Sequence, residues 1–450
     1  MVRSVIFSVI FLMSLRGVYA QEIKRLSLRE AVKTGLSNNI NLNQQKNLLR
    51  SSRVTKTAGM LGLGPSVSIN GNAGTNNGNT FIQQVGIVNG ESDFMRASLN
   101  ASMPLFSGLS TLNTYRQSAS LYEAQLHLVH RTSQDVIRDI SRQYLACLLD
   151  EQLVKINQKN LETQQRQRDL ISELVNAGSR AEVDLKNQEY QVKNAELILL
   201  RSKNTLRNDK AMLSQLLQVD PAVVIDLEEP SWNIDDLSNL SAEELYQVAG
   251  DRRSDLKTAE SNEKASEFGY HANQGYYFPS ISAFAQYGSA YNYIYPNKVQ
   301  LDPNNRSFDQ QFVNDNTNLT YGISFQIPLY GAFQNRSSTA RSRAQYENAK
   351  LQKENTEIVV KSEVLLAHQN LQDAITSYTV AQAQLQAAET ANALEKERYE
   401  LGISDIVAIT VSNQSYTRAE ADYASAKYTL MFQKLMINHA AGTLTFEDVP

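Results

Sequence analysis

The chain presents the same order of sequence patterns twice, and this duplication constrains its fold more than any other feature. LSLREAVKTGL (26–36) aligns with LSAEELYQVAG (240–250), and GPSVSI (64–69) aligns with FPSISA (278–283), both with a shift of 214 residues. Further along, a shift of 224 residues aligns two more pairs of segments, MPLFSG (103–108) with IPLYGA (327–332) and NAGSRAEV (176–183) with ELGISDIV (400–407). Because the register stays constant within each block, we infer a duplicated chain. The expected organisation is a first repeat at 21–218, a linker or equatorial region at 219–240, a second repeat at 241–444 and a tail at 445–450.

Each half contains two segments in which apolar and polar residues alternate. In NLTYGISFQIPL, Tyr321 and Ile323 fall on one face and Thr320 and Ser324 on the other. A period of two is typical of a strand with one apolar face. We predict four strands of about the length that a tilted membrane-spanning strand needs, at about 66–76, 94–104, 279–291 and 318–329.

The segments that join these strands, 74–92 and 291–316, are rich in Asn, Gly and Asp. Such residues favour turns and need no packed core, so we expect polar loops exposed to water. Tyrosines gather near the predicted strand ends, which is typical of the aromatic girdles at a membrane interface. The ordinary β-propensity of tyrosine is the alternative explanation.

The remaining sequence of each half has a helical pattern. No proline occurs from Leu105 to Asp220 or from Leu329 to Val449, and apolar residues recur at spacings of three and four. A helix of roughly 70 residues would be about 100 Å long. The narrow apolar stripe predicts long helical hairpins with coiled-coil-like packing, whose turns lie near Gly178 and Gly402.

The first 20 residues resemble a secretory signal peptide. Arg3 precedes the apolar run VIFSVIFLMSL, and the small residues Val18 and Ala20 occupy the −3 and −1 positions of a cleavage site. A retained membrane anchor is the alternative. No later segment has the roughly 20 apolar residues of a spanning helix, so we expect an exported protein that enters a membrane only with strands.

The sequence contains no constellation typical of catalysis. The five histidines are scattered, the chain lacks HExxH, GxSxG and P-loop motifs, and the one cysteine, Cys147, lies in an apolar helical stretch. The net charge of −4 gives no basic surface for nucleic acid. We therefore predict a protein that is not an enzyme, with no catalytic residue, no cofactor, no metal site and no nucleic-acid partner.

Four membrane-spanning strands cannot close a barrel, and hydrocarbon does not tolerate an open sheet edge. The predicted solution is a homotrimer, whose three chains would supply a 12-stranded outer-membrane β-barrel. The long helices would continue this barrel as an α-helical barrel. The expected fold class is therefore mainly α with β, in two internal structural repeats.

The order and double occurrence of these motifs carry a resemblance to a known family. PLFSG and PLYGA before the long helices, AGSRAEVDL and LGISDIVAI within them, and the closing LMINHAAGTL are similar to the outer-membrane efflux protein (TolC) family. The resemblance implies a homotrimeric exit duct of a tripartite efflux or type I secretion system. Such a duct would lie in the outer membrane of a Gram-negative bacterium, extend into the periplasm and meet a periplasmic adaptor and an inner-membrane transporter.

The resemblance also implies roles for the two glycine turns. The adaptor would dock on the tips, formed by Ala177, Gly178, Ser179, Leu401, Gly402 and Ile403. Asp184 and Tyr399 match members of the family's gate network, whereas Ser404 stands where its pattern has arginine. We expect Arg180 as an alternative partner of Asp184, and Asp405 as a source of negative charge at the gate.

Two other classes of protein compete with this interpretation. A secreted periplasmic coiled-coil structural or interaction protein without a pore would explain the helices but not the alternating segments. A porin or uptake receptor would need many more strands per chain and less helix.

Overall fold

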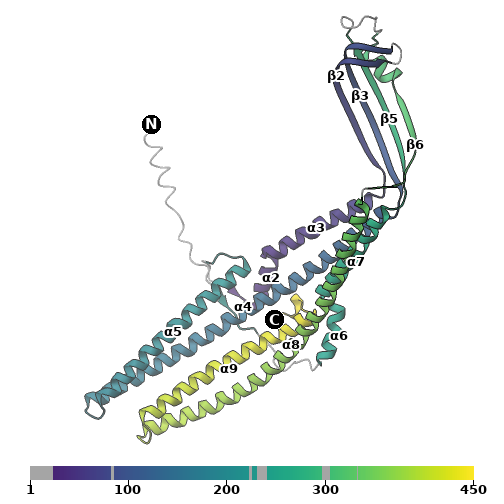
Figure 1. Cartoon of the computed structure of the whole chain (residues 1–450). Coiled ribbons are helices and arrows are strands. Elements are labelled where there is room, and N and C mark those ends of the chain that lie inside the picture. Colours follow the sequence, from purple (N-terminus) through teal and green to yellow (C-terminus); the bar gives the residue numbers. More distant parts are fainter. Residues whose placement is uncertain (1–23, 83–85, 222–224, 231–240, 296–304, 332) are drawn as a thin grey trace, which may run out of the picture. The chain divides into compact units, whose positions relative to one another are not determined.

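The computed structural model describes residues 24–82, 86–221, 225–230, 241–295, 305–331 and 333–450 (Figure 1). The predicted signal peptide at 1–20 and part of the predicted linker at 219–240 lie outside the described residues. Two compact units make up the chain: one comprises 1–46, 128–256 and 357–450, and the other 47–127 and 257–356.

The helices of the two halves have matching lengths. Both α2 (Leu28–Asn38) and α6 (Ala242–Arg252) have 11 residues, and α3 (Ile40–Leu61) and α7 (Ser254–Gly275) have 22. The two longest, α4 (Ser110–Asn176) and α8 (Gln334–Glu400), have 67 residues, and α5 (Glu182–Leu217) and α9 (Ile406–Ala441) have 36.

A capping box opens the first helix of each half. The Ser27 side chain accepts a hydrogen bond from the Glu30 amide before α2, and the Ser241 side chain accepts one from the Glu244 amide before α6. In both, the glutamate side chain accepts from the serine amide in return, which satisfies two amides that the helix leaves unpaired.

Among the described helices, none has a stretch long and apolar enough to cross a membrane.

The first unit has its main core where α4 and α9 pack with α2, α5 and a two-stranded parallel sheet, β1 (Lys24–Leu26) and β4 (Ile225–Leu227). Tyr144 of α4 is fully buried, and its hydroxyl lies 2.7 Å from the carbonyl oxygens of both Leu26 and Glu228. This tyrosine thereby fixes the small sheet to the long helix. Cys147 lies in the same core, and burial raises the pKa of its thiol to about 12, so it behaves as a packed apolar residue.

The long helices form two antiparallel hairpins, α4–α5 and α8–α9 (Figure 1). Between α4 and α5, a small apolar cluster is supported by an ion pair of 2.8 Å from Lys210 to Glu151 and by a buried hydrogen bond of 2.8 Å between the side-chain amides of Gln188 and Gln164. A second apolar cluster joins α6 to α8 and α9. The hairpins are therefore held by narrow apolar seams, as the sequence period predicts.

The second unit contains a four-stranded antiparallel sheet in the order β2–β3–β5–β6 (Figure 1). Its strands are β2 (Ser66–Ile82), β3 (Gly86–Ser107), β5 (Ser280–Ile294) and β6 (Asn318–Gln326). Strands β2 and β3 continue through most of 74–92, so the prediction of a polar loop there was wrong. The cross-strand hydrogen bonds satisfy this polar backbone in an extended hairpin. A short π-helix, Gln310–Asp315, interrupts the connection between β5 and β6.

The register of the sheet brings like residues together on each face. Ile69, Leu99, Tyr287 and Leu319 form one row across the four strands, and all four are exposed. The next row, on the opposite face, consists of Ser68, Asn100, Gln286 and Thr320. The sheet therefore has one exposed apolar face and one polar face, which is what the alternation within each strand predicts once the strands are in register.

Candidate functional site at the helical hairpin turns

The first hairpin turn lies between α4, which ends at Asn176, and α5, which begins at Glu182. Gly178 has a left-handed conformation with φ of +74°. Its amide donates to the Val175 carbonyl at 2.9 Å, and the Ser179 amide donates to the Leu174 carbonyl at 2.8 Å. These two bonds form the Schellman motif, which ends a helix at a glycine.

The second turn, between Glu400 and Ile406, repeats this geometry. Gly402 has φ of +75°, and its amide donates to the Tyr399 carbonyl at 3.0 Å. The Ile403 amide donates to the Arg398 carbonyl at 2.9 Å. No atom outside the turn lies within 4 Å of a Cβ built on Gly178 or Gly402, so glycine is required there by the backbone angle rather than by close packing.

The predicted docking residues of both tips are exposed. Leu401 and Ile403 expose 67% and 65% of their surface, and Ala177 and Ser179 are also exposed. Val407, in the first turn of α9, adds a third large apolar side chain at 65%. Exposed apolar groups at the end of a polar helical hairpin are typical of a protein-binding surface.

The structure brings two of the four candidate gate residues together. The Arg180 guanidinium lies 3.9 Å from the Asp184 carboxylate, and both side chains are partly buried. The Asp405 carboxylate accepts a hydrogen bond of 2.8 Å from the Ala408 amide and caps α9. The Tyr399 hydroxyl is buried and has no hydrogen-bond partner among the described residues, so no bond links it to Asp184.

Sequence reasoning missed the role of Ser404 in the second turn. Its hydroxyl donates to the carboxylate of Glu395 on α8, and that carboxylate also pairs with Arg398 at 3.3 Å. The residue that replaces the family's arginine therefore binds within its own hairpin. A serine nine residues after a glutamate has no recognisable pattern, so no sequence signal could have found this contact.

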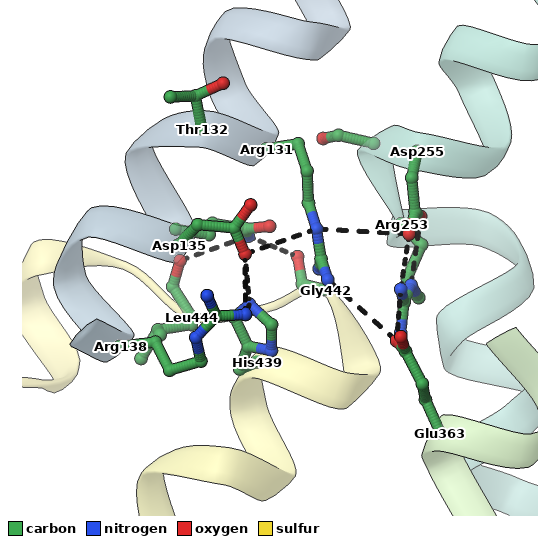
Figure 2. Close-up of polar contacts among 12 residues, drawn as sticks. Arg131, Thr132, Asp135, Arg138, Arg253, Asp255, Glu363, His439, Gly442 and Leu444 are labelled. Carbon is green, nitrogen blue, oxygen red and sulfur yellow. Dashed lines mark hydrogen bonds and ion pairs between the residues drawn. The ribbon is translucent and has the colours of Figure 1, made fainter. Parts of the chain in front are cut away.

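A second group of polar residues, the polar cluster, lies where the C-terminal end of α9 meets α4, α8 and the junction of α6 and α7 (Figure 2). Its titratable members are Arg131, Asp135, Arg138, Arg253, Asp255, Glu363 and His439. Arg253 is fully buried; its guanidinium donates to the Glu363 carboxylate at 2.7 Å, to the Ala440 carbonyl at 3.2 Å and to Asp255. Burial of this cation is tolerated because two carboxylates face it.

On the α4 side of the polar cluster, the His439 ring lies 2.8 Å from the Asp135 carboxylate (Figure 2). Burial lowers the pKa of His439, although the bond to Asp135 opposes this effect. Burial raises the pKa of Asp135, but the hydrogen bond from His439 and the charges of Arg131 and Arg138 outweigh it and hold that pKa below its usual value. Nearby, the Gln134 amide donates to the carbonyls of Gly442 and Leu444 at 2.9 and 3.2 Å.

The polar cluster is suited to holding helices together. Each of its three arginines pairs with at least one carboxylate, because Arg131 and Arg253 face Asp255 and Glu363, and Arg138 faces Asp135 and the adjacent Asp139. Within the described part of the chain, no group of three or more His, Cys, Asp or Glu residues could hold a metal ion. No local sequence pattern indicates that His439 is buried, because its partner Asp135 lies in the other half of the chain.

The sequence profile of the family described as outer membrane efflux protein matches residues 31–218 and 245–443. Among curated proteins, the outer membrane protein TolC of Salmonella enteritidis is 22% identical over 320 residues, which cover 70% of this chain and 62% of that protein. TolC of Escherichia coli strain K12 is also 22% identical, over 317 residues, 70% of this chain and 63% of that protein. The matched region thus spans less than two thirds of either relative.

Solved structures share the fold at low sequence identity. The outer membrane protein VceC of Vibrio cholerae has a TM-score of 0.80 at 15% identity and covers 92% of this chain and 96% of its own. The CmeC outer membrane channel of Campylobacter jejuni has a TM-score of 0.80 at 16% identity, and the match covers 92% of this chain and 85% of CmeC. The MtrE outer membrane channel of Neisseria gonorrhoeae, in its open state, has a TM-score of 0.75 at 16% identity, with coverage of 93% and 91%.

Proposed function

Because the chain belongs to the outer membrane efflux protein family, we propose that it is the exit duct of a tripartite efflux or type I secretion system. Membership of this family places the protein in the outer membrane and sets it apart from enzymes. The duct would pass substrates from an inner-membrane pump through the periplasm and the outer membrane. The exposed apolar face of the sheet is the observation that carries this proposal.

The sheet supports assembly into a trimer. Strands β2 and β6 each pair on one side only within the described residues, so both edges of the sheet are open. An apolar face requires lipid, whereas open edges in lipid would leave backbone groups unpaired at several kcal/mol each. Three copies joined edge to edge would satisfy both edges and supply 12 strands. The row that contains Asn100 and Gln286 would then face an aqueous lumen.

The helices support a continuation of this tube in the periplasm. The equal lengths of the paired helices, with capping boxes at Ser27 and Ser241, fit a duplicated subunit that contributes two similar hairpins. Three subunits would contribute six hairpins, and their narrow apolar seams suit side-by-side packing. The result would be an α-helical barrel with six tips.

We assign adaptor docking to the tips because they combine a rigid glycine turn with exposed apolar side chains. Leu401 and Ile403 would provide the apolar contact of one tip, next to Gly402. Ala177, Gly178 and Ser179 would provide a smaller and more polar contact at the other. An adaptor that meets all six tips would therefore encounter two alternating kinds of surface.

The gate is assigned to Arg180, Asp184, Tyr399 and Asp405, near these tips. Partly exposed ion pairs such as Arg180–Asp184 contribute about 0–1 kcal/mol, which suits a contact that must open. We expect Asp184→Ala to raise the single-channel conductance in planar bilayers. If the conductance stays at the parent value, Asp184 has no role in gating.

The duct itself is tested by extracting outer membranes with detergent and separating the proteins by gel electrophoresis with and without heating. We expect a heat-modifiable trimer that also forms conducting channels in planar bilayers. A soluble periplasmic protein would instead support the coiled-coil interaction protein without a pore.

Adaptor docking is tested by crosslinking from a cysteine placed at a tip. We expect Ile403→Cys to crosslink a periplasmic adaptor in whole cells, because this side chain is 65% exposed. The native Cys147 does not compete, since it is fully buried. Ile358→Cys, at an exposed position far from the tip on α8, is the matched control. Equal crosslinking from both positions would contradict docking at the tips.

A further inference from the structure

A pocket of about 400 Å³ lies between α4 of one hairpin and α8 and α9 of the other. Its wall from α4 includes Asn160 and Gln167, and its opposite wall includes Asn392, Asn413 and Thr417. Its volume is in the range of roughly 300–1,000 Å³ that small-molecule sites occupy. Eight of its 15 lining residues carry an amide or a hydroxyl group, which distinguishes it from the apolar seams that hold each hairpin together.

Unpartnered polar atoms concentrate around this pocket. Within the residues that the structure describes, eight buried side-chain nitrogen or oxygen atoms have no hydrogen-bond partner, and four of them belong to residues that line it. They are both amide atoms of Gln167, the Asn392 side-chain oxygen and the Tyr399 hydroxyl. Gln167 is only 9% exposed. Since buried polar groups are nearly always paired, this concentration points to a ligand that completes the hydrogen bonding.

The charged residues around the pocket indicate the charge of the ligand. Lys159 pairs with Glu420 at 3.1 Å. Arg166, Lys396 and Glu400 make no ion pair within the described residues. The lining therefore holds three cations and two carboxylates, and one added negative charge would balance it.

We propose that this pocket binds a small hydroxylated carboxylate, of the size and chemistry of a sugar acid. The carboxylate would lie against Lys396 and Arg166, where the excess positive charge is. The hydroxyl groups would both donate to and accept from the amide of Gln167, which offers a donor and an acceptor. A ligand held in this way contacts α4 and α8 and faces the wall that α9 contributes to the pocket.

The test is calorimetric titration of the full-length protein in detergent with D-glucuronate, D-glucose and acetate. Glucose keeps the hydroxyls without the charge, and acetate keeps the charge without the hydroxyls. We expect saturable binding of glucuronate, and at least tenfold weaker binding of the other two. An absence of saturable glucuronate binding, or equal affinity for glucose, would overturn the proposal.

Variants locate the binding in this pocket. We expect Lys396→Met and Gln167→Leu each to weaken glucuronate binding at least tenfold. Lys193 and Gln165 lie outside the pocket. Lys193→Met and Gln165→Leu are therefore the matched controls and should leave the affinity for glucuronate unchanged. Circular dichroism and native gel mobility identify variants that fail to fold or assemble. If folded pocket variants bind as the parent does, the heat comes from elsewhere and this pocket is not the site.

Discussion

Gly442 packs so closely against Arg253 that a Cβ atom on the glycine would lie 2.8 Å from the Arg253 Cα atom and 2.9 Å from its amide nitrogen. Gly442 also has φ of +73°, in the left-handed region that ends α9. We expect Gly442→Ala to lower the free energy of unfolding by more than about 2 kcal/mol, because the left-handed conformation alone costs roughly 1–2 kcal/mol and backbone atoms cannot move aside. Chemical denaturation in detergent, followed by circular dichroism, measures this change.

Gly250→Ala is the control for that substitution. Gly250 lies within α6, and no atom lies within 4 Å of a Cβ built on it. Alanine there should raise the free energy of unfolding by up to about 1 kcal/mol, since glycine weakens a helix. Similar destabilisation by both substitutions would show that close packing at Gly442 is unimportant.

The ion pair between Arg253 and Glu363 predicts a second stability effect. The Arg253 side chain is 1% exposed, and one of its two carboxylate partners is Glu363 at 2.7 Å. We expect Glu363→Gln to lower the free energy of unfolding by about 1–2 kcal/mol, because a charged hydrogen bond to a buried cation is weakened. Glu347→Gln is the control: it breaks the exposed ion pair with Arg343 and should change the free energy of unfolding by at most about 0.5 kcal/mol. Equal denaturation midpoints for the two variants would contradict this account.

Asp150 predicts a pH dependence within the α4–α5 hairpin. Burial, together with a hydrogen bond to Asp209 and the charge of that carboxylate, raises the pKa of Asp150 to about 7. In the unfolded chain its pKa is about 3.9. The folded state therefore binds more protons between about pH 4 and pH 7, and the contribution of Asp150 to stability falls as pH rises through this window.

Asp150→Asn should remove this contribution, since the amide stays uncharged. Relative to the parent, we expect the variant to gain stability as pH rises from 4.5 to 7.5, measured by denaturation at each pH. His439, whose pKa is lowered, acts in the opposite direction at the acid end but is the same in both proteins. Asp169→Asn, at an exposed position, is the control, and its stability should depend on pH in the same way as that of the parent. If the stability of Asp150→Asn has the same pH dependence as that of the parent, the prediction is wrong.

The two faces of the sheet predict different responses to charge. Ile323 lies on the apolar face and is 67% exposed, whereas Thr320 lies on the polar face. We expect Ile323→Arg to destabilise the membrane-inserted sheet by about 2–4 kcal/mol, the cost of an arginine facing lipid near the midplane. Thr320→Arg should be tolerated in an aqueous lumen. The yield of heat-modifiable trimer in outer membranes measures both, and equal yields would contradict the assignment of the faces.

Features that depend on neighbouring residues could be predicted from the sequence. A period of two predicted β2, β3, β5 and β6, although not their full lengths, and a period near 3.6 predicted the long helices. Gly178 and Gly402 marked the hairpin turns because a left-handed backbone is inexpensive only for glycine. These signals are local, so they can be read before the chain is folded.

Contacts between polar groups that are distant in the sequence became evident only in the folded chain. Asp135 and His439 are 304 residues apart, and Arg253 reaches Glu363 across 110 residues, so no local pattern announces either contact. The unpartnered amide of Gln167 could not be predicted from the sequence either, because a glutamine within a helical pattern is expected to be exposed to solvent. Burial and hydrogen bonding depend on what the rest of the chain places beside a residue, and that is set by packing rather than by periodicity.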